Sequence, residues 1–150
     1  QFNNGSGDYE IISMTDLSAS PSYVIAKNYS VKSTVADVST GTVVRFYGRK
    51  SDYVGYGTVS QRGMKTTYID ENGNVIGVVY DLSRIKVTYG GNLAGDSGGP
   101  IFSDHEDGGK WVTYCGVLNA SHAEDGYLYI DFTPYRYPHA AGFTVATYQG

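Results

Sequence analysis

Frequent turn-forming residues constrain the fold of this chain more than any other feature, because they divide it into short segments. Twenty of its 150 residues are glycine, and glycine, aspartate and asparagine bound the stretches in which apolar and polar residues alternate. Alternation is clear in 42–47, 84–89 and 126–132, and no stretch has a convincing helical period of apolar residues. The sequence therefore predicts an all-β protein of short strands and tight turns, with less than about 10% helix.

Two polar segments are predicted to connect strands. The segment Asp70-Glu71-Asn72-Gly73-Asn74 has the composition of a hairpin turn and separates the stretches 66–69 and 75–80. The segment 104–110, rich in charge and glycine, predicts an exposed loop before Trp111. The tail, 143–148, is predicted to be a further strand.

Charge and composition limit the classes of partner. The formal net charge of −4 argues against nucleic acid or an anionic membrane as a partner. No apolar run approaches the roughly 18 residues of a membrane-spanning helix, and no signal peptide precedes Gln1, so we expect a processed, secreted chain. The single cysteine, Cys115, lies in an apolar stretch and is expected to be a buried free thiol. We expect neither a metal ion nor a cofactor.

One hexapeptide, Gly95-Asp96-Ser97-Gly98-Gly99-Pro100, has the composition of a nucleophilic serine in a glycine-rich turn. Small residues suit this chemistry because the backbone N–H groups of Gly95 and Ser97 must converge where the oxyanion of a tetrahedral intermediate forms. Glycine tolerates the dihedral angles that aim its N–H there. An ordinary turn of Gly, Asp and Ser is the alternative, but the complete hexapeptide followed by an apolar strand favours the nucleophile.

The hexapeptide resembles the nucleophile signature of the chymotrypsin-like serine proteases, and the chain is most similar to the bacterial secreted branch that includes the streptogrisins and α-lytic protease. The other segments that carry the resemblance are 8–13 (catalytic aspartate), 42–48 and 57–59 (first hairpin of the second barrel), 116–121 (strand lining the specificity pocket) and 126–129 (far side of the pocket). The resemblance implies a six-stranded antiparallel Greek-key barrel of the trypsin-like fold over 35–150. It implies that 1–34 is an N-terminal strand and an inter-barrel segment from an incomplete first barrel.

The resemblance also assigns roles near the nucleophile. Ser97 would form the acyl-enzyme, and Asp8 would orient the imidazole that accepts the serine proton. A turn residue at a strand entry is the alternative for Asp8, but its separation from Ser97 (97 − 8 = 89 residues) suits the family. Asp96 would be a buried, paired carboxylate that stabilises the oxyanion turn, with a partner that the sequence does not identify.

The histidines depart from the family pattern. In this fold the catalytic histidine precedes the catalytic aspartate, whereas His105, His122 and His139 all follow Ser97. We expect His105 and His139 to be solvated surface residues, and His122 could line the substrate cleft. The catalytic histidine is therefore expected in a histidine-bearing N-terminal chain, separate or cleaved off, and these residues alone are expected to be inactive.

Substrate preference follows from the pocket that the resemblance implies. Its floor would lie at Gly91 with Asn92 beside it, and the residues assigned to its walls and rim are Asn119, Ala120, Ser121, His122 and Gly126. Because no acidic residue stands at Gly91, a preference for Lys or Arg is not expected. The small walls suit medium or large apolar or aromatic side chains. His122 leaves open a preference for acidic side chains, as in glutamyl endopeptidases.

Two functions of different classes remain open. The first is one chain of a two-chain serine endopeptidase that hydrolyses peptide or protein substrates through Ser97. The second is a catalytically silent protease homologue that acts in binding or assembly. The intact serine turn favours the first, whereas the missing histidine favours the second if no histidine-bearing partner exists.

Overall fold

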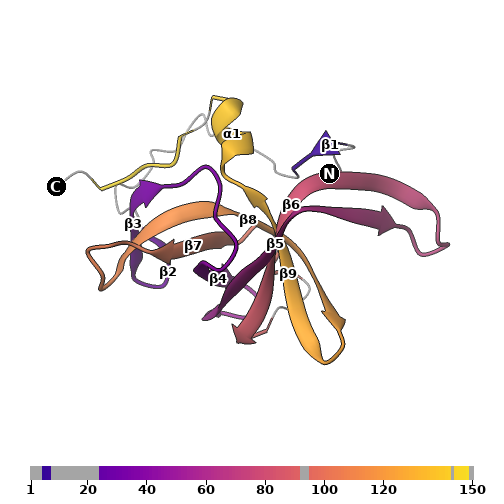
Figure 1. Cartoon of the computed structure of the whole chain (residues 1–150), viewed down its shortest axis with the longest axis horizontal. Coiled ribbons are helices and arrows are strands. Elements are labelled where there is room, and N and C mark those ends of the chain that lie inside the picture. Colours follow the sequence, from indigo (N-terminus) through magenta and orange to yellow (C-terminus); the bar gives the residue numbers. More distant parts are fainter. Residues whose placement is uncertain (1–4, 8–23, 92–94, 143, 149–150) are drawn as a thin grey trace.

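The structure is a computed structural model, and it describes residues 5–7, 24–91, 95–142 and 144–148. Within these residues the chain is almost entirely β (Figure 1), which confirms the predicted fold class. The elements are β1 (Gly5–Ser6), β2 (Val24–Ala26), β3 (Tyr29–Thr34), β4 (Val43–Gly48), β5 (Tyr53–Ile69), β6 (Val75–Tyr89), β7 (Pro100–Asp104), β8 (Trp111–Glu124), β9 (Tyr127–Pro134) and the short helix α1 (Arg136–Ala140).

Six strands pair around a ring, which confirms the predicted six-stranded antiparallel barrel. The order around the ring is β4, β5, β6, β9, β8 and β7, and every neighbouring pair is antiparallel. The pairing of β7 with β4 is the shortest, since it contains only the pairs Arg45↔Phe102 and Phe46↔Ile101. Because β6 pairs with β9 and not with β7, the chain crosses the barrel between them, as a Greek key requires.

The interior of the barrel is apolar because alternate residues of each strand point inward. In β4, Val44 and Phe46 are buried on either side of the half-buried Arg45. All six strands of the ring contribute to this core, whose buried residues are Val38, Val44, Phe46, Val59, Ile85, Ile101, Cys115, Leu118, Ile130 and Phe132. In β4, the alternation read from the sequence is therefore the alternation of inward and outward faces.

Three short strands lie outside the ring. β1 pairs in parallel with β6, β2 pairs with β3, and β3 pairs in parallel with β8 along Trp111–Tyr114. β3 also buries Val31 in a second apolar cluster with Phe102 and Val112. The division of the chain into 1–34 and 35–150 stays a prediction.

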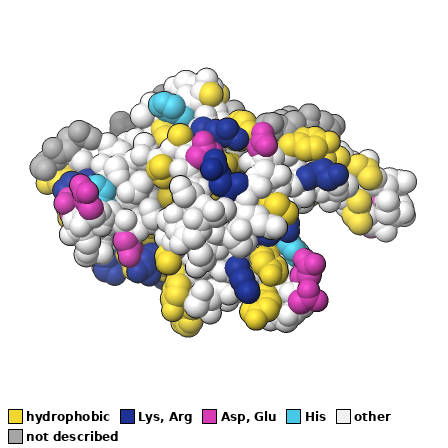
Figure 2. Space-filling view, in the orientation of Figure 1, with side chains coloured by type: hydrophobic (Ala, Val, Ile, Leu, Met, Phe, Trp, Pro, Cys, Tyr) yellow, Lys and Arg dark blue, Asp and Glu magenta, His cyan; other side chains and the backbone are white. Residues whose placement is uncertain are grey.

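The two predicted connections are present. The carboxylate of Asp70 accepts hydrogen bonds from the N–H groups of Asn72 and Asn74, both 2.9 Å, which closes the turn between β5 and β6. Between the barrel and that turn, β5 and β6 extend as a two-stranded ribbon. Figure 2 shows apolar side chains along this ribbon. The segment 105–110 forms the turns between β7 and β8.

The prediction of a strand in the tail is wrong, because residues 144–148 contain no strand. The tail is attached instead by separate contacts. The N–H of Tyr148 donates to the carbonyl of Val31 at 2.9 Å, and its ring stacks on Trp111 with centroids 4.7 Å apart. The N–H of Val145 donates to the hydroxyl of Tyr135 at 3.1 Å. The sequence pattern also gave no sign of α1, because five residues are too few to display a helical period. In the described residues no helix is long and apolar enough to cross a membrane.

Cys115 is fully buried in the barrel core, as predicted for a free thiol. Burial raises its pKa from 9 to about 11, against a smaller opposing effect of the Ser103 hydroxyl. A thiol of an unfolded chain ionises first, so the unfolded state binds fewer protons than the folded state between pH 9 and 11. The contribution of Cys115 to the free energy of unfolding is therefore complete below pH 9 and is lost as pH rises through this window.

We expect Cys115 to resist modification in the folded protein, because the thiolate is the reactive species. Its reaction with Ellman's reagent at pH 8 should proceed no faster than the protein unfolds, and it should be rapid in denaturant. The coloured thiolate that the reagent releases can be followed by absorbance, both for the native protein and for the protein in denaturant. Immediate reaction of the native protein would contradict the burial of this side chain.

Candidate active site

The serine turn lies between β6 and β7 and is hydrogen-bonded to the middle of β8. Gly95 and Gly98 have φ angles of +102° and +88°, a backbone region that side-chain-bearing residues rarely adopt. The N–H of Gly98 donates to the carbonyl of Leu118, and the N–H of Leu118 donates to the carbonyl of Gly99, both at 2.8 Å. Ser97 is exposed at the tip of this turn. Gly95 therefore has a backbone conformation of the kind that the sequence predicted for it.

The hydroxyl of Ser97 donates a hydrogen bond of 2.9 Å to the main-chain carbonyl of Asn119. Asn119 lies at an irregularity in the pairing of β8 with β9, where the register shifts between Leu118 and Ala120. Its side-chain oxygen accepts a hydrogen bond of 2.7 Å from the buried hydroxyl of Thr133. Ser97 and Asn119, predicted as nucleophile and pocket wall, are thus in direct contact.

Asp96 is buried, with 2% of its surface exposed, and its carboxylate is paired. Oδ1 accepts the main-chain N–H of Ser51 at 2.9 Å, and Oδ2 accepts the hydroxyl of Ser51. Ser51 lies in the turn between β4 and β5, and it supplies the partner that the sequence left open. The sequence has no local signal for this contact, since the two residues are 45 positions apart.

Two glycines allow the serine turn to lie against the turn between β4 and β5. A Cβ on Gly48 would overlap the carboxyl group of Asp96, and a Cβ on Gly99 would overlap the main-chain oxygen of Tyr47. Neither position has room for a side chain. The close approach of the two turns therefore depends on glycine on both sides.

The remaining predicted pocket residues lie on the hairpin of β8 and β9 and near the end of β6. Ala120 and Ser121 pair with residues of β9, and Gly126 lies in the hairpin turn with φ +81°. Gly91 is half-buried, and a Cβ there would approach the hydroxyl of Tyr53. Asp8 and Asn92 lie outside the described residues. The oxyanion hole of Gly95 and Ser97, the role of Asp8 and the pocket assignment stay predictions.

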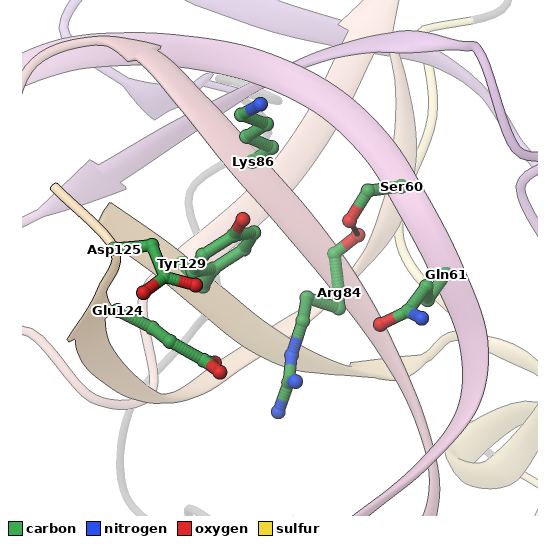
Figure 3. A pocket seen from close by; sticks show the side chains of 7 residues that line it. All are labelled: Ser60, Gln61, Arg84, Lys86, Glu124, Asp125 and Tyr129. Atoms are coloured by element: carbon green, nitrogen blue, oxygen red, sulfur yellow. Dashed lines mark hydrogen bonds between the residues drawn. The ribbon is translucent and has the colours of Figure 1, made fainter. Parts of the chain in front are cut away.

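The side chain of His122 contacts two residues of the hairpin formed by β8 and β9. Its ring stacks on Tyr129 with centroids 5.5 Å apart, and its Nε2 lies 3.5 Å from a carboxylate oxygen of Glu124. Tyr129 and Glu124 also line an open groove of about 420 Å³, whose other lining residues are Ser60, Gln61, Arg84, Lys86 and Asp125. In Figure 3 the side chains of Glu124 and Arg84 face each other across this groove. The sequence did not indicate this charged groove.

The other two histidines contact residues away from the serine turn. His105 lies in the turn after β7, where its Nδ1 accepts the N–H of Asp107 at 3.2 Å, and only 15% of its side chain is exposed. It is therefore mostly covered, contrary to the expectation of a solvated side chain. His139 is an exposed residue of α1, as expected, and its ring lies against Tyr135. Among the described residues, no three His, Cys, Asp or Glu side chains are grouped so as to hold a metal ion.

A scan against protein-family models and a search of curated proteins found no match to this sequence. Solved structures do match. Protease A of Thermobifida fusca superposes with a TM-score of 0.59 at 21% identity, covering 80% of this chain and 56% of that one. Cellulomonas bogoriensis chymotrypsin gives 0.58 at 21% identity, with coverages of 80% and 57%. A glutamic-acid-specific serine protease, described as using a histidine triad in substrate binding, gives 0.62 at 24% identity, with coverages of 85% and 61%.

These matches cover most of this chain, but the chain spans only 56–61% of the length of the three proteases. Sequence identity between 21% and 24% is low, and the likeness lies in the arrangement of the strands. The six-stranded ring and the glycine-rich turn between β6 and β7 agree with it. The chain therefore has the β-barrel fold of the bacterial chymotrypsin-like serine proteases.

Proposed function

We propose that these residues form part of a secreted serine endopeptidase that hydrolyses peptide bonds through an acyl-enzyme on Ser97. The observation that carries the proposal is an exposed serine hydroxyl at the tip of a turn that is fixed on both sides. The buried Asp96 fixes the turn to Ser51, and main-chain hydrogen bonds to Leu118 fix it to β8. Such preorganisation suits a site that stabilises charge in a transition state.

In the proposed reaction, the oxygen of Ser97 attacks the carbonyl carbon of the scissile peptide bond while a base accepts the hydroxyl proton. The N–H groups of Gly95 and Ser97 would donate hydrogen bonds to the oxyanion of the tetrahedral intermediate. The protonated base then gives its proton to the leaving amine, and water hydrolyses the acyl-enzyme. Before attack, the hydroxyl must exchange its hydrogen bond with the carbonyl of Asn119 for one with the base.

We infer that the base is a histidine supplied by a polypeptide outside these residues. Support comes from the contacts of the three histidines in the chain: His105 with Asp107, His122 with Tyr129 and Glu124, and His139 with Tyr135. Asp8 would orient the supplied imidazole. The segment 1–34 would then be a remnant of the first barrel and the segment that crosses between barrels, and 35–150 would be the barrel that carries the nucleophile and the pocket.

We propose that the pocket accepts an apolar or aromatic side chain. The small residues Gly91, Ala120 and Gly126 are the assigned floor and walls, beside Asn92, Asn119 and Ser121. A preference for acidic side chains is less well supported, since the Nε2 of His122 already faces the carboxylate of Glu124 at 3.5 Å. That carboxylate would repel a second negative charge near the imidazole.

The decisive experiment is covalent labelling of the native protein, purified with any polypeptide bound to it, by a fluorophosphonate probe. We expect a single labelled residue, Ser97, because only a serine activated by a base reacts with such probes. Ser97→Ala should abolish labelling. Ser103→Ala is the matched control, because Ser103 lies near the active turn in sequence but is half-buried in β7, and its labelling should equal that of the wild type.

Labelling that persists in Ser97→Ala would contradict the assignment of the nucleophile. Absence of labelling in protein that is shown by intact mass to contain a histidine-bearing second polypeptide would favour the silent homologue, whose function is binding or assembly. The peptide that carries the label can be identified by mass spectrometry after digestion.

A further inference from the structure

The serine turn rests on a second turn, formed by residues 48–52 between β4 and β5. The N–H of Asp52 donates to the carbonyl of Gly48 at 2.8 Å, which closes this second turn. The overlaps expected for a Cβ on Gly48 or Gly99 show that the two turns are in van der Waals contact. The 48–52 turn is therefore the surface against which the serine turn is shaped.

Ser51 is the residue of the 48–52 turn that binds the serine turn through polar groups. Its main-chain N–H and its hydroxyl donate to the two carboxylate oxygens of Asp96, one to each. Two donors to one carboxylate fix both the position of the group and the rotation of its plane. Since Asp96 is 2% exposed, water cannot easily replace a lost donor.

Asp96 lies in the chain between Gly95 and Ser97, the two residues whose N–H groups the proposed mechanism uses. The peptide group that follows its Cα atom carries the N–H of Ser97, whereas the N–H of Gly95 is separated from that Cα atom by the backbone of Gly95. A carboxylate held in one orientation restricts rotation about the Cα–Cβ bond and the backbone around it. The orientation of the Ser97 N–H is thereby linked to the hydroxyl of Ser51 directly, and that of the Gly95 N–H through the backbone of Gly95.

We propose that Ser51 is a positioning residue whose hydroxyl, acting through Asp96, holds the N–H groups of Gly95 and Ser97 in the orientation that catalysis needs. This inference rests on the proposed endopeptidase function. Ser51 contacts neither substrate nor the reacting atoms, so its effect is on the rate of the chemical step and not on substrate binding. If the hydroxyl had a purely structural role, its removal would lower the stability of the protein and leave both kcat and KM unchanged.

The ion pair between Lys27 and Asp52, a residue of the same turn, should have little effect on the rate of catalysis. The carboxylate of Asp52 accepts hydrogen bonds from Lys27 Nζ at 2.7 Å and from the hydroxyl of Tyr47 at 2.6 Å. The side chains of Lys27 and Asp52 are 44% and 65% exposed, so solvent weakens their attraction. Lys27→Ala is therefore a control that perturbs the same turn without touching Asp96.

The test compares Ser51→Ala, Ser51→Thr and Lys27→Ala in the native protein. Ser51→Ala should lower kcat for a peptide substrate, and the rate constant of fluorophosphonate labelling, roughly ten-fold with little change in KM. Ser51→Thr retains a hydroxyl and should restore most of this loss. Lys27→Ala should behave as the wild type. Circular dichroism verifies that each variant is folded.

Amide hydrogen exchange gives a readout that does not depend on catalysis. In Ser51→Ala, the amides of Gly98 and Gly99 should exchange faster than in the wild type, whereas amides of β8 beyond the turn should be unchanged. If the wild type reacts with the probe and Ser51→Ala reacts equally fast, the inference is wrong while the proposed function stands. If wild-type protein shown to contain the histidine-bearing polypeptide does not react, the proposed function is wrong, and unchanged exchange in Ser51→Ala then also overturns the positioning role.

Discussion

Replacement of Ser97 by alanine should reduce kcat for peptide hydrolysis by roughly 10⁴–10⁶-fold in protein that includes the catalytic histidine. The methyl group cannot attack a carbonyl carbon, so no acyl-enzyme forms. The remaining rate would come from water attack on a substrate whose oxyanion is still stabilised by the N–H groups of the turn. Hydrolysis of a chromogenic peptide, measured under saturating substrate, gives the ratio of the two kcat values.

The fold should tolerate this change. Ser97 is exposed, and alanine removes only the hydrogen bond to the carbonyl of Asn119, which solvent can replace. Circular dichroism and the unfolding midpoint of Ser97→Ala should therefore match the wild type. A fall in kcat of less than about ten-fold with an intact fold would show that another residue is the nucleophile.

Local features of the fold and of the serine turn were predictable from the sequence, because each depends on residues that are close together in the chain. Gly95 was expected to adopt a conformation that favours glycine, and its φ angle is positive. The alternation in 42–47 identified β4, and the composition of 70–74 identified the turn between β5 and β6. These predictions needed only the preferences of single residues and the period of a strand.

Contacts between distant segments were not predictable in the same way. A serine at position 51 has no property that marks it as the partner of Asp96, because the pairing depends on how β4 and the serine turn meet in space. The tail was predicted as a strand because its residues alternate, but a strand also needs a partner with free hydrogen-bonding groups. The tail makes separate contacts with Val31, Trp111 and Tyr135 instead.

The second large effect concerns stability. Asp131→Ala should lower the free energy of unfolding by about 3 kcal/mol, because it removes the carboxylate that is hydrogen-bonded to the guanidinium of Arg84, whose side chain is only 15% exposed. Asp131 is 3% exposed and accepts two hydrogen bonds from Arg84, of 2.7 and 2.9 Å, and one from Thr66 of 3.1 Å. The pair joins β6 to β9 within the barrel, and the carboxylate raises the pKa of Arg84.

The structure contains a matched control for this prediction. Arg45 and Asp104 form a pair of the same geometry, with hydrogen bonds of 2.9 and 3.2 Å, but their side chains are 31% and 59% exposed. Because water can solvate the guanidinium that remains, Asp104→Ala should cost no more than about 1 kcal/mol. Urea unfolding of both variants, compared at equal m-values, separates the two cases. Equal losses of stability would show that burial of the Arg84–Asp131 pair does not determine its contribution, and that the barrel relaxes to hydrate Arg84 when its partner is removed.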